Sequence, residues 1–292
     1  MTSKTFTVAE KAVLSAYIAT PNRDELRPAV IVLPGGGWSG TSPSEGECVA
    51  LAYLTQGFQA FVLDYSTLKS NPTGCSYPQP LLELAESVRL LKAHAQEWHI
   101  DKDRIFVLGF SAGGFICGSY GNRWRWIAEQ LGCDAEEVRV AGTVLCYPAV
   151  DTVMLYDTIH QMTAALDLDD ITGDQASMQL KDFERATKLG LFGKTDVTED
   201  EIRAVSAYEH LSADTLPAFI WGTYQDGIID PRQLYRYADR LCKLGISHEL
   251  HLFEKGPHGM SLANEQSAHA PENVIGDLQA WHPLSVAWMH RH

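Results

Sequence analysis

Ser111 stands at the centre of the segment Gly109–Gly113, which has the sequence Gly-Phe-Ser-Ala-Gly. The apolar segment Arg104–Leu108 predicts a buried strand directly before it, and a helix-compatible run follows it. This setting is typical of a nucleophile elbow, a sharp strand-to-helix turn that exposes the serine hydroxyl and leaves no room for side chains two residues away. The pattern predicts a nucleophilic serine, with an ordinary turn of small residues as the alternative.

A serine hydroxyl is a poor nucleophile at neutral pH and needs a base within hydrogen-bonding reach. Among the eleven histidines, His258 alone lies in a turn that directly follows a late predicted strand, in the segment Glu254–Met260. The Gly256-Pro257 pair before it indicates a loop beyond the carboxyl end of that strand, where open α/β sheets bind their ligands. We predict that His258 is the base and that the other histidines have surface or core roles.

The imidazole needs a carboxylate that fixes its tautomer and stabilises the imidazolium. Asp226 is the favoured candidate, because it follows the predicted strand Ala218–Trp221 and leaves room for one helix and one strand before His258. The chain order serine, aspartate, histidine is a known order for such a triad. Asp230 is the rival acid, although its place before Pro231 is also the one expected of a helix-capping residue.

A glycine-rich segment, Pro34–Trp38, follows another predicted strand and could bind a developing oxyanion. Such chemistry requires hydrogen-bond donors aimed at the oxygen, each worth about 3 to 4 kcal/mol in comparable sites. We expect the backbone N–H groups of Gly36, Gly37 or Trp38 to act together with that of Ala112. Taken alone, three consecutive glycines could equally form a flexible turn.

The elements that must position these groups alternate between short β-rich runs and helical patterns. This alternation predicts an α/β fold with a mostly parallel central sheet and helices on both faces. Leu81 to Leu91 carries apolar residues at helical spacing, which predicts an amphipathic helix. The predicted strands are Phe6–Val8, Val13–Ile18, Ala29–Leu33, Ala60–Leu63, Arg104–Leu108, Val138–Leu145, Ala218–Trp221 and Glu249–Phe253.

One stretch, about residues 151–205, interrupts the alternation with polar helical patterns. Thr198 and Glu201 have the spacing of a capping box, which predicts a helix that starts near Glu199. We expect one domain over residues 1–292, in which this insertion forms a lid over the active site; a subunit interface or a passive cover is the alternative. The acidic side chains in it are interpreted as a solvated face in preference to a calcium loop: Asp167, Asp169, Asp170 and Asp174.

Net charge, hydropathy and cysteine spacing disfavour several classes of protein. The 37 acidic and 23 basic side chains give a net charge of −14, which disfavours nucleic acid and anionic membrane surfaces as partners. No window approaches the about 20 consecutive apolar residues of a spanning helix, and the first residues lack the pattern of a secretory signal. The six cysteines have no zinc-site spacing and are expected to be reduced and mostly buried. We therefore expect a soluble, cytoplasmic protein, with a secreted form whose signal has been removed as the alternative.

Taken together, these motifs resemble those of α/β-hydrolases, and within them those of bacterial esterases related to acetyl-xylan esterases and other carbohydrate acetylesterases. The sequence differs from them at Pro34, where a histidine is usual, at Gly222, where a histidine often follows the tryptophan, and at Asp230, where proline is common. The resemblance covers nearly the whole chain. It rests on Pro34–Trp38, Gly109–Gly114, Ser206–Tyr208, Trp221–Asp230, Leu252–Met260 and Trp281–Trp288.

The resemblance implies a serine carboxylesterase that acts on short-chain acyl esters, acetyl above all, of sugars or xylo-oligosaccharides. It implies a triad of Ser111, His258 and Asp226 that works through an acyl-enzyme, without metal or organic cofactor. The partner is then a small-molecule or oligosaccharide ester, and homo-oligomerisation is left open. An amidase, formamidase or peptidase of the same fold is one alternative, and a non-catalytic binding protein is another. Five aromatic residues could line a sugar or acyl pocket or pack in the core: Trp38, Tyr65, Trp124, Trp126 and Tyr147.

Overall fold

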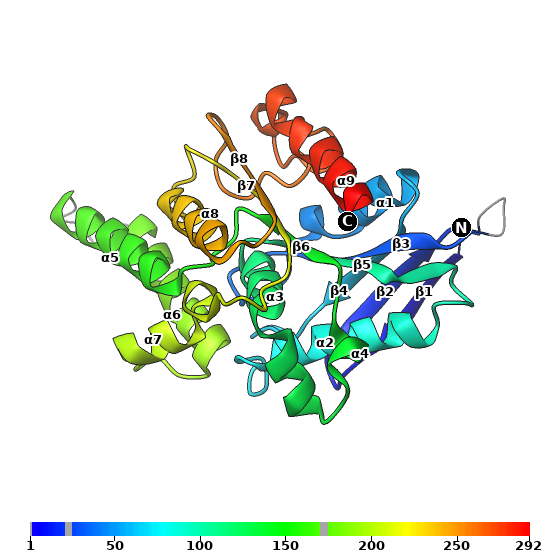
Figure 1. Ribbon diagram of the computed structural model, residues 1–292. Coiled ribbons are helices and arrows are strands. Elements are labelled where there is room, and N and C mark those ends of the chain that lie inside the picture. The colour runs from blue at the N-terminus through cyan, green and yellow to red at the C-terminus, as the bar shows by residue number, and fades with distance from the viewer. Residues whose placement is uncertain (1, 21–24, 170–174) are drawn as a thin grey trace.

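The computed structural model describes residues 2–20, 25–169 and 175–292, and the side chains within them except those of residues 165–178. Its centre is an eight-stranded sheet with the strand order β1-β2-β4-β3-β5-β6-β7-β8 (Figure 1). Strands β3 to β8 run parallel to one another, whereas β2 runs antiparallel to both of its neighbours, β1 and β4. The strands are β1 (Thr2–Thr7), β2 (Val13–Ile18), β3 (Arg27–Leu33), β4 (Gln59–Asp64), β5 (Ile100–Phe110), β6 (Gly142–Cys146), β7 (Ala218–Thr223) and β8 (His248–Phe253).

Two hydrophobic cores lie on opposite faces of this sheet. Successive strand side chains point to opposite faces, so that in β3 Ala29, Ile31 and Leu33 enter one core while Val30 and Val32 enter the other. Helices cover both faces (Figure 1). The predicted mostly parallel α/β fold is confirmed.

The helices divide between the two cores. Residues of α2 (Gln79–Ala93), α3 (Ala112–Leu131), α4 (Ala135–Val138) and α8 (Arg232–Leu244) pack into the first core. Residues of α1 (Glu47–Thr55) and α9 (Trp281–Arg291) pack into the second. Short 3-10 helices complete the connections: η1 (Pro43–Glu45), η2 (Ala207–His210), η3 (Pro271–Asn273) and η4 (Gly276–Ala280).

One predicted strand begins in the wrong place. The apolar run from Val138 to Leu145 was expected to be extended throughout, but Val138 ends helix α4 and β6 starts only at Gly142. The reason is local, because Asp134 and Glu137 form a capping box that starts a helix there. The first strand also differs, since β1 ends at Thr7 and does not extend over Val8.

The insertion is helical in the residues described. It consists of α5 (Thr152–Asp169), α6 (Gln175–Phe192) and α7 (Glu199–Val205), which gather at one end of the molecule (Figure 1). Thr198 and Glu201 form the expected capping box, so the predicted helix start is confirmed. The acidic side chains Asp167, Asp169, Asp170 and Asp174 lie outside the described part, and their predicted role stays a prediction.

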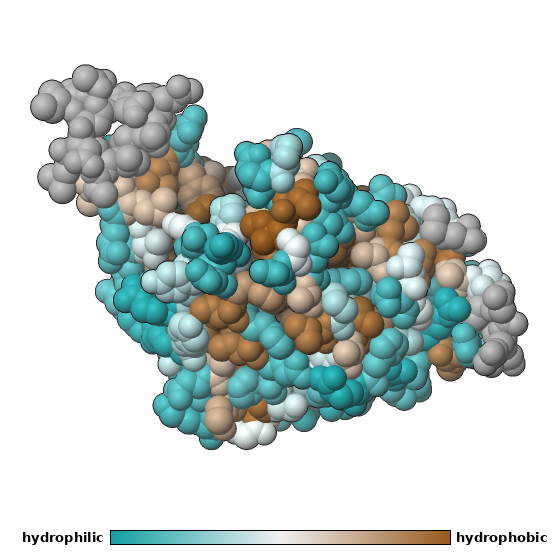
Figure 2. Space-filling model, turned by 90° about the horizontal axis from the view of Figure 1, so that it is seen from above, coloured by the Kyte–Doolittle hydropathy of each residue, from teal (hydrophilic) through white to brown (hydrophobic). Residues whose placement is uncertain are grey.

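None of the helices in the described residues combines the length and the apolar character that crossing a membrane requires. In the view of Figure 2, hydrophobic residues form several separate patches among hydrophilic ones. All six cysteines lie in the described residues and none is in a disulfide; Cys75, Cys117 and Cys146 are buried and Cys242 is exposed.

Candidate active site

Ser111 lies at the junction of β5 and α3, at the carboxyl edge of the sheet. Its φ of 51° and ψ of −114° are unusual for a residue with a side chain, as expected of a nucleophile elbow. A Cβ atom on Gly109 would lie 2.1 Å from the carbonyl oxygen of Gly113, and one on Gly113 would lie 2.2 Å from that of Leu33. Both positions therefore require glycine, for the steric reason that the sequence pattern indicates.

The structure brings together the serine, histidine and aspartate singled out in the sequence. Nε2 of His258 lies 2.8 Å from Oγ of Ser111, and Nδ1 lies 2.8 Å from Oδ2 of Asp226. The other carboxylate oxygen of Asp226 accepts hydrogen bonds from the backbone N–H groups of Ile228 and Ile229. Asp226 is thereby held in one orientation, and its free oxygen is aimed at the imidazole.

Asp230, the alternative candidate for the triad acid, contacts Arg232 and not His258 in the described residues. Its carboxylate forms an ion pair with the guanidinium of Arg232 and accepts a hydrogen bond from the backbone N–H of the same residue. These contacts with Arg232 lower the pKa of Asp230. Pro231 has helical backbone angles, so Asp230 caps the start of α8, which is the structural role expected for it.

The loop after β3 offers backbone donors beside Ser111. Among the described residues, no acceptor contacts the N–H groups of Gly36, Gly37, Trp38 or Ala112. Gly35 lies directly against Ser111, since a Cβ atom on it would be 2.9 Å from Cβ of Ser111. The four N–H groups predicted for an oxyanion hole are thus available.

Two residues hold this loop: Glu45, which was not singled out from the sequence, and Tyr65, which was considered only for a pocket or the core. Glu45 accepts a hydrogen bond of 2.8 Å from the backbone N–H of Gly35. The hydroxyl of Tyr65 donates to the carbonyl oxygen of Pro34 at 2.8 Å. Nothing in the local sequence marks Glu45, because Glu47 stands two residues away and only packing decides which of the two is buried.

Most of the aromatic residues considered for a pocket belong to the core. Trp38, Tyr65, Trp124 and Tyr147 are all buried, and Trp126 is partly exposed with the guanidinium of a neighbouring arginine 4.0 Å over its ring. Tyr147 still matters to the site, because its ring centroid lies 5.1 Å from that of His258. Core packing, the alternative to a pocket role, therefore describes four of the five aromatic residues.

Helix α6 packs directly against the glycine-rich loop Pro34–Trp38. A Cβ atom on Gly37 would lie 2.9 Å from Cε2 of Phe183, and one on Gly190 would lie 2.6 Å from Cβ of Trp38. The backbone N–H of Tyr77 donates to the carbonyl oxygen of Leu191 at 3.0 Å. The insertion thus reaches the loop that carries the expected oxyanion donors.

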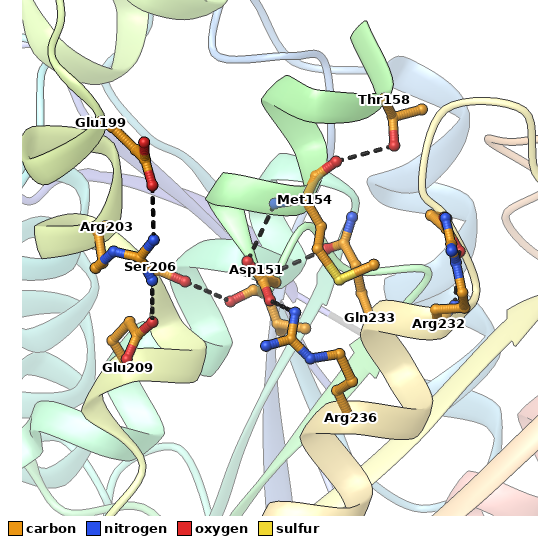
Figure 3. A network of polar contacts seen from close by, with 12 residues as sticks. Asp151, Met154, Thr158, Glu199, Arg203, Ser206, Glu209, Arg232, Gln233 and Arg236 are labelled. Atoms are coloured by element: carbon orange, nitrogen blue, oxygen red, sulfur yellow. Dashed lines mark hydrogen bonds and ion pairs between the residues drawn. The ribbon is translucent and has the colours of Figure 1, made fainter. Parts of the chain in front are cut away.

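Asp151, at the start of the insertion, forms hydrogen bonds with residues of both α5 and α8. Figure 3 shows its carboxylate between the backbone N–H of Met154, at 3.1 Å, and the guanidinium of Arg236, at 2.7 Å. Its own N–H donates to Oε1 of Gln233. These contacts fix the first helix of the insertion to the helix that follows the Asp226 loop. A groove of about 500 Å³ opens beside this junction, between α5 and the start of α8.

The strand order and the nucleophile elbow define an α/β-hydrolase fold. The BD-FAE family model matches residues 14–241, which is most of the chain, and the protein belongs to this family. The match covers Ser111 and Asp226 and ends before His258.

Relatives of this chain are carboxylesterases and other hydrolases. It is 27% identical to endo-1,4-beta-xylanase B of Butyrivibrio fibrisolvens over 256 residues. This aligned region covers 87% of this chain and 35% of the relative. The chain thus spans well under two thirds of the curated relatives it matches, 35% of one and 44% of another.

Solved structures match over nearly the whole chain. A sugar hydrolase from Lactococcus lactis has a TM-score of 0.75 and 27% identity, with 99% of this chain and 98% of that one covered. An acetyl ester-xyloside bifunctional hydrolase from Caldicellulosiruptor lactoaceticus has a TM-score of 0.72 and 26% identity, with 96% and 88% covered.

Proposed function

We propose that this protein is a serine carboxylesterase that hydrolyses short-chain acyl esters, with acetylated sugars as its substrates. The observation that carries the proposal is the continuous hydrogen-bonded chain from Asp226 through His258 to Ser111, with both contacts at 2.8 Å. Few arrangements other than nucleophilic catalysis require a serine at so strained a backbone position with an imidazole on its hydroxyl.

In the first half of the reaction, Ser111 attacks the ester carbonyl while Nε2 of His258 takes its proton. Asp226 accepts a hydrogen bond from the Nδ1–H group of His258, which leaves Nε2 free to act as a base and stabilises the imidazolium that forms. The N–H groups of Ala112 and of the Gly36 to Trp38 loop stabilise the oxyanion of the tetrahedral intermediate. His258 then protonates the departing alcohol, and an acyl-enzyme on Ser111 remains.

The second half repeats these steps with water as the nucleophile. His258 takes a proton from the water, which attacks the acyl carbonyl, and the same donors stabilise the second oxyanion. Collapse of this intermediate releases the carboxylic acid as Ser111 regains its proton from His258.

The choice of acetylated sugars is supported by the names of the relatives, which include a xylanase, a sugar hydrolase and an acetyl ester-xyloside hydrolase. A net charge of −14 also suits a neutral, polyhydroxylated substrate better than an anionic one. Six cysteines without a disulfide suit the cytoplasmic location expected from the sequence.

We further propose that residues 1–292 form one domain, with the segment 151–205 as a lid that limits substrate size. The packing of Phe183 against Gly37 supports this, because it places α6 in contact with the loop Pro34–Trp38, which we call the oxyanion loop. Loops at this edge of an α/β sheet commonly carry specificity while the sheet holds the catalytic groups.

Hydrolysis of p-nitrophenyl acetate, butyrate and octanoate beside p-nitroacetanilide, with acetate release from acetylated xylo-oligosaccharides, tests the activity. Turnover of the short esters and the oligosaccharides without the anilide is expected. Preferred turnover of the anilide indicates an amidase, and no turnover of any substrate indicates a binding protein; either result contradicts the proposal.

A further inference from the structure

Glu45 is a buried carboxylate directly behind the nucleophile. It is the last residue of η1, its residue exposure is 3%, and Gly35 separates it from Ser111. A Cβ atom on Gly35 would lie 2.9 Å both from Oε2 of Glu45 and from Cβ of Ser111. Burial raises the pKa of Glu45, and a carboxylate removed from water needs hydrogen-bond donors in its place.

One side of the Glu45 carboxylate holds the oxyanion loop. Oε2 accepts the N–H of Gly35, the residue that precedes the three expected donors of that loop. The carbonyl oxygen of Gly35 accepts the N–H of Ser42, just before η1. Gly35 is thus fixed to the η1 segment through both of its backbone polar groups, which sets where the following N–H groups point.

The other side of the carboxylate holds the segment after His258. The hydroxyl of Tyr147 donates to Oε1 of Glu45 at 2.5 Å and accepts the N–H of Ser261 at 2.9 Å. The hydroxyl of Ser261 also donates to the carbonyl oxygen of Ser44, beside Glu45, at 2.6 Å. The ring of Tyr147 meanwhile packs edge-on against the imidazole of His258.

We propose that Glu45 is a positioning residue that aligns the oxyanion loop with the histidine loop through one hydrogen-bonded chain, Gly35 to Glu45 to Tyr147 to Ser261. The proposal rests on the esterase activity proposed above. A carboxylate is required because both of its contacts come from donors, and an ionised carboxylate accepts on both oxygens. A glutamine can accept the N–H of Gly35 through its oxygen, but its NH₂ group then faces the Tyr147 hydroxyl as a second donor beside the N–H of Ser261. The hydrogen bond that Tyr147 donates to Glu45 is therefore lost.

The test compares Glu45→Gln with the parent protein in steady-state hydrolysis of p-nitrophenyl acetate. A misaligned oxyanion loop should lower kcat by about 10- to 100-fold and leave KM within about threefold of the parent value. The loss is smaller than the decrease of about 10²- to 10³-fold that follows removal of a whole oxyanion donor. The second readout is inhibition by an alkyl trifluoromethyl ketone. Ser111 adds to its carbonyl carbon, the proton moves to His258, and the resulting oxyanion occupies the hole. Its Ki should rise by about the same factor as kcat/KM falls.

Glu83→Gln is the matched control, because Glu83 is also a buried glutamate, at 1% exposure, and accepts a backbone N–H and a hydroxyl, both of Ser66. It should lower Tm while kcat and Ki stay within about twofold of the parent. A parallel loss of kcat and ketone binding in Glu83→Gln contradicts a specific role for Glu45.

Tyr147→Phe is the second variant, in case Glu45→Gln does not fold. It keeps the ring beside His258 and removes only the hydroxyl that joins Glu45 to Ser261, so it should also lower kcat and weaken ketone binding, by about 5- to 20-fold. If either folded variant has parental kcat and Ki, the inference is wrong. If the parent itself hydrolyses no ester, the proposed function fails instead.

Discussion

Asp226 and His258 are joined by a contact of 2.8 Å between Oδ2 and Nδ1, although 32 residues separate them in the chain. Two backbone N–H groups, of Ile228 and Ile229, occupy the other oxygen of the carboxylate. The pair therefore has one geometry in which the imidazole presents Nε2 to Ser111. Asp230, only four residues later, is held by Arg232.

This difference predicts unequal effects of two matched substitutions. Asp226→Asn should lower kcat on p-nitrophenyl acetate by about 10⁴-fold, because an amide does not hold the tautomer or stabilise the imidazolium. Asp230→Asn should change kcat by less than about threefold, since it alters only the start of α8. Steady-state kinetics on both variants, with Tm as a folding check, measures this. The opposite ranking would assign the acid role to Asp230.

Phe183 should limit the length of the acyl group. Its ring lies against Gly37, so Phe183→Ala should open space beside the oxyanion loop and raise kcat/KM for p-nitrophenyl octanoate relative to acetate by about tenfold. Phe192→Ala removes the same side chain from the same helix, at its end against Tyr156, and should leave that ratio unchanged. Identical chain-length profiles for the two variants would show that α6 does not shape the acyl site.

His282 should make the protein sensitive to acid. Burial lowers the pKa of His282 to about 4, and its Nε2 has no hydrogen-bond partner among the described residues. In the unfolded chain a histidine has a pKa of about 6.5, so between these values the unfolded state binds the proton and the folded state does not. The unfolding free energy therefore falls as pH drops from about 6.5 to about 4.

The variant His282→Phe should remove this part of the acid sensitivity, which amounts to at most about 3 kcal/mol. A phenyl ring can keep the edge-on contact with Tyr53. Urea unfolding of both proteins at several values between pH 4.5 and 7.5 gives the comparison. Equal losses of unfolding free energy on acidification would mean that His282 titrates normally.

Cys242 should be the one fast-reacting thiol. It is exposed on α8, whereas burial raises the pKa of the other five thiols and makes them less reactive. A maleimide should add about one equivalent to the folded protein and none to Cys242→Ser, without loss of esterase activity. Inactivation that Cys242→Ser prevents would instead place this helix face at the site.

The strand-to-helix turn at Ser111 and the nearness of Asp226 and His258 to it could be predicted from the sequence, because they follow from local rules. Gly109 and Gly113 are required by clashes that any such turn produces, and Asp226 and His258 each follow a recognisable strand. A local rule also explains why the predicted start of β6, at Val138, is wrong. The capping box at Asp134 competes with the β propensity of the run that begins at Val138, and the helix prevails there.

The remaining features depend on packing between distant segments, which no local pattern encodes. Glu45 and Tyr147 are 102 residues apart, and their contact arises only when η1 and the turn after β6 meet behind Ser111. The approach of Phe183 to Gly37 has the same origin, because a helical pattern does not tell which loop a helix will cover.

The central claim is that Ser111 is the nucleophile, and covalent labelling tests it most directly. Incubation with a p-nitrophenyl alkylphosphonate should release one equivalent of p-nitrophenol as the serine oxygen displaces it from phosphorus. Peptide mapping by mass spectrometry should then find a single adduct, on Ser111. The folded Ser111→Ala protein should acquire no adduct and hydrolyse no ester. An inactivating adduct on another residue, or ester turnover by folded Ser111→Ala, would contradict the account.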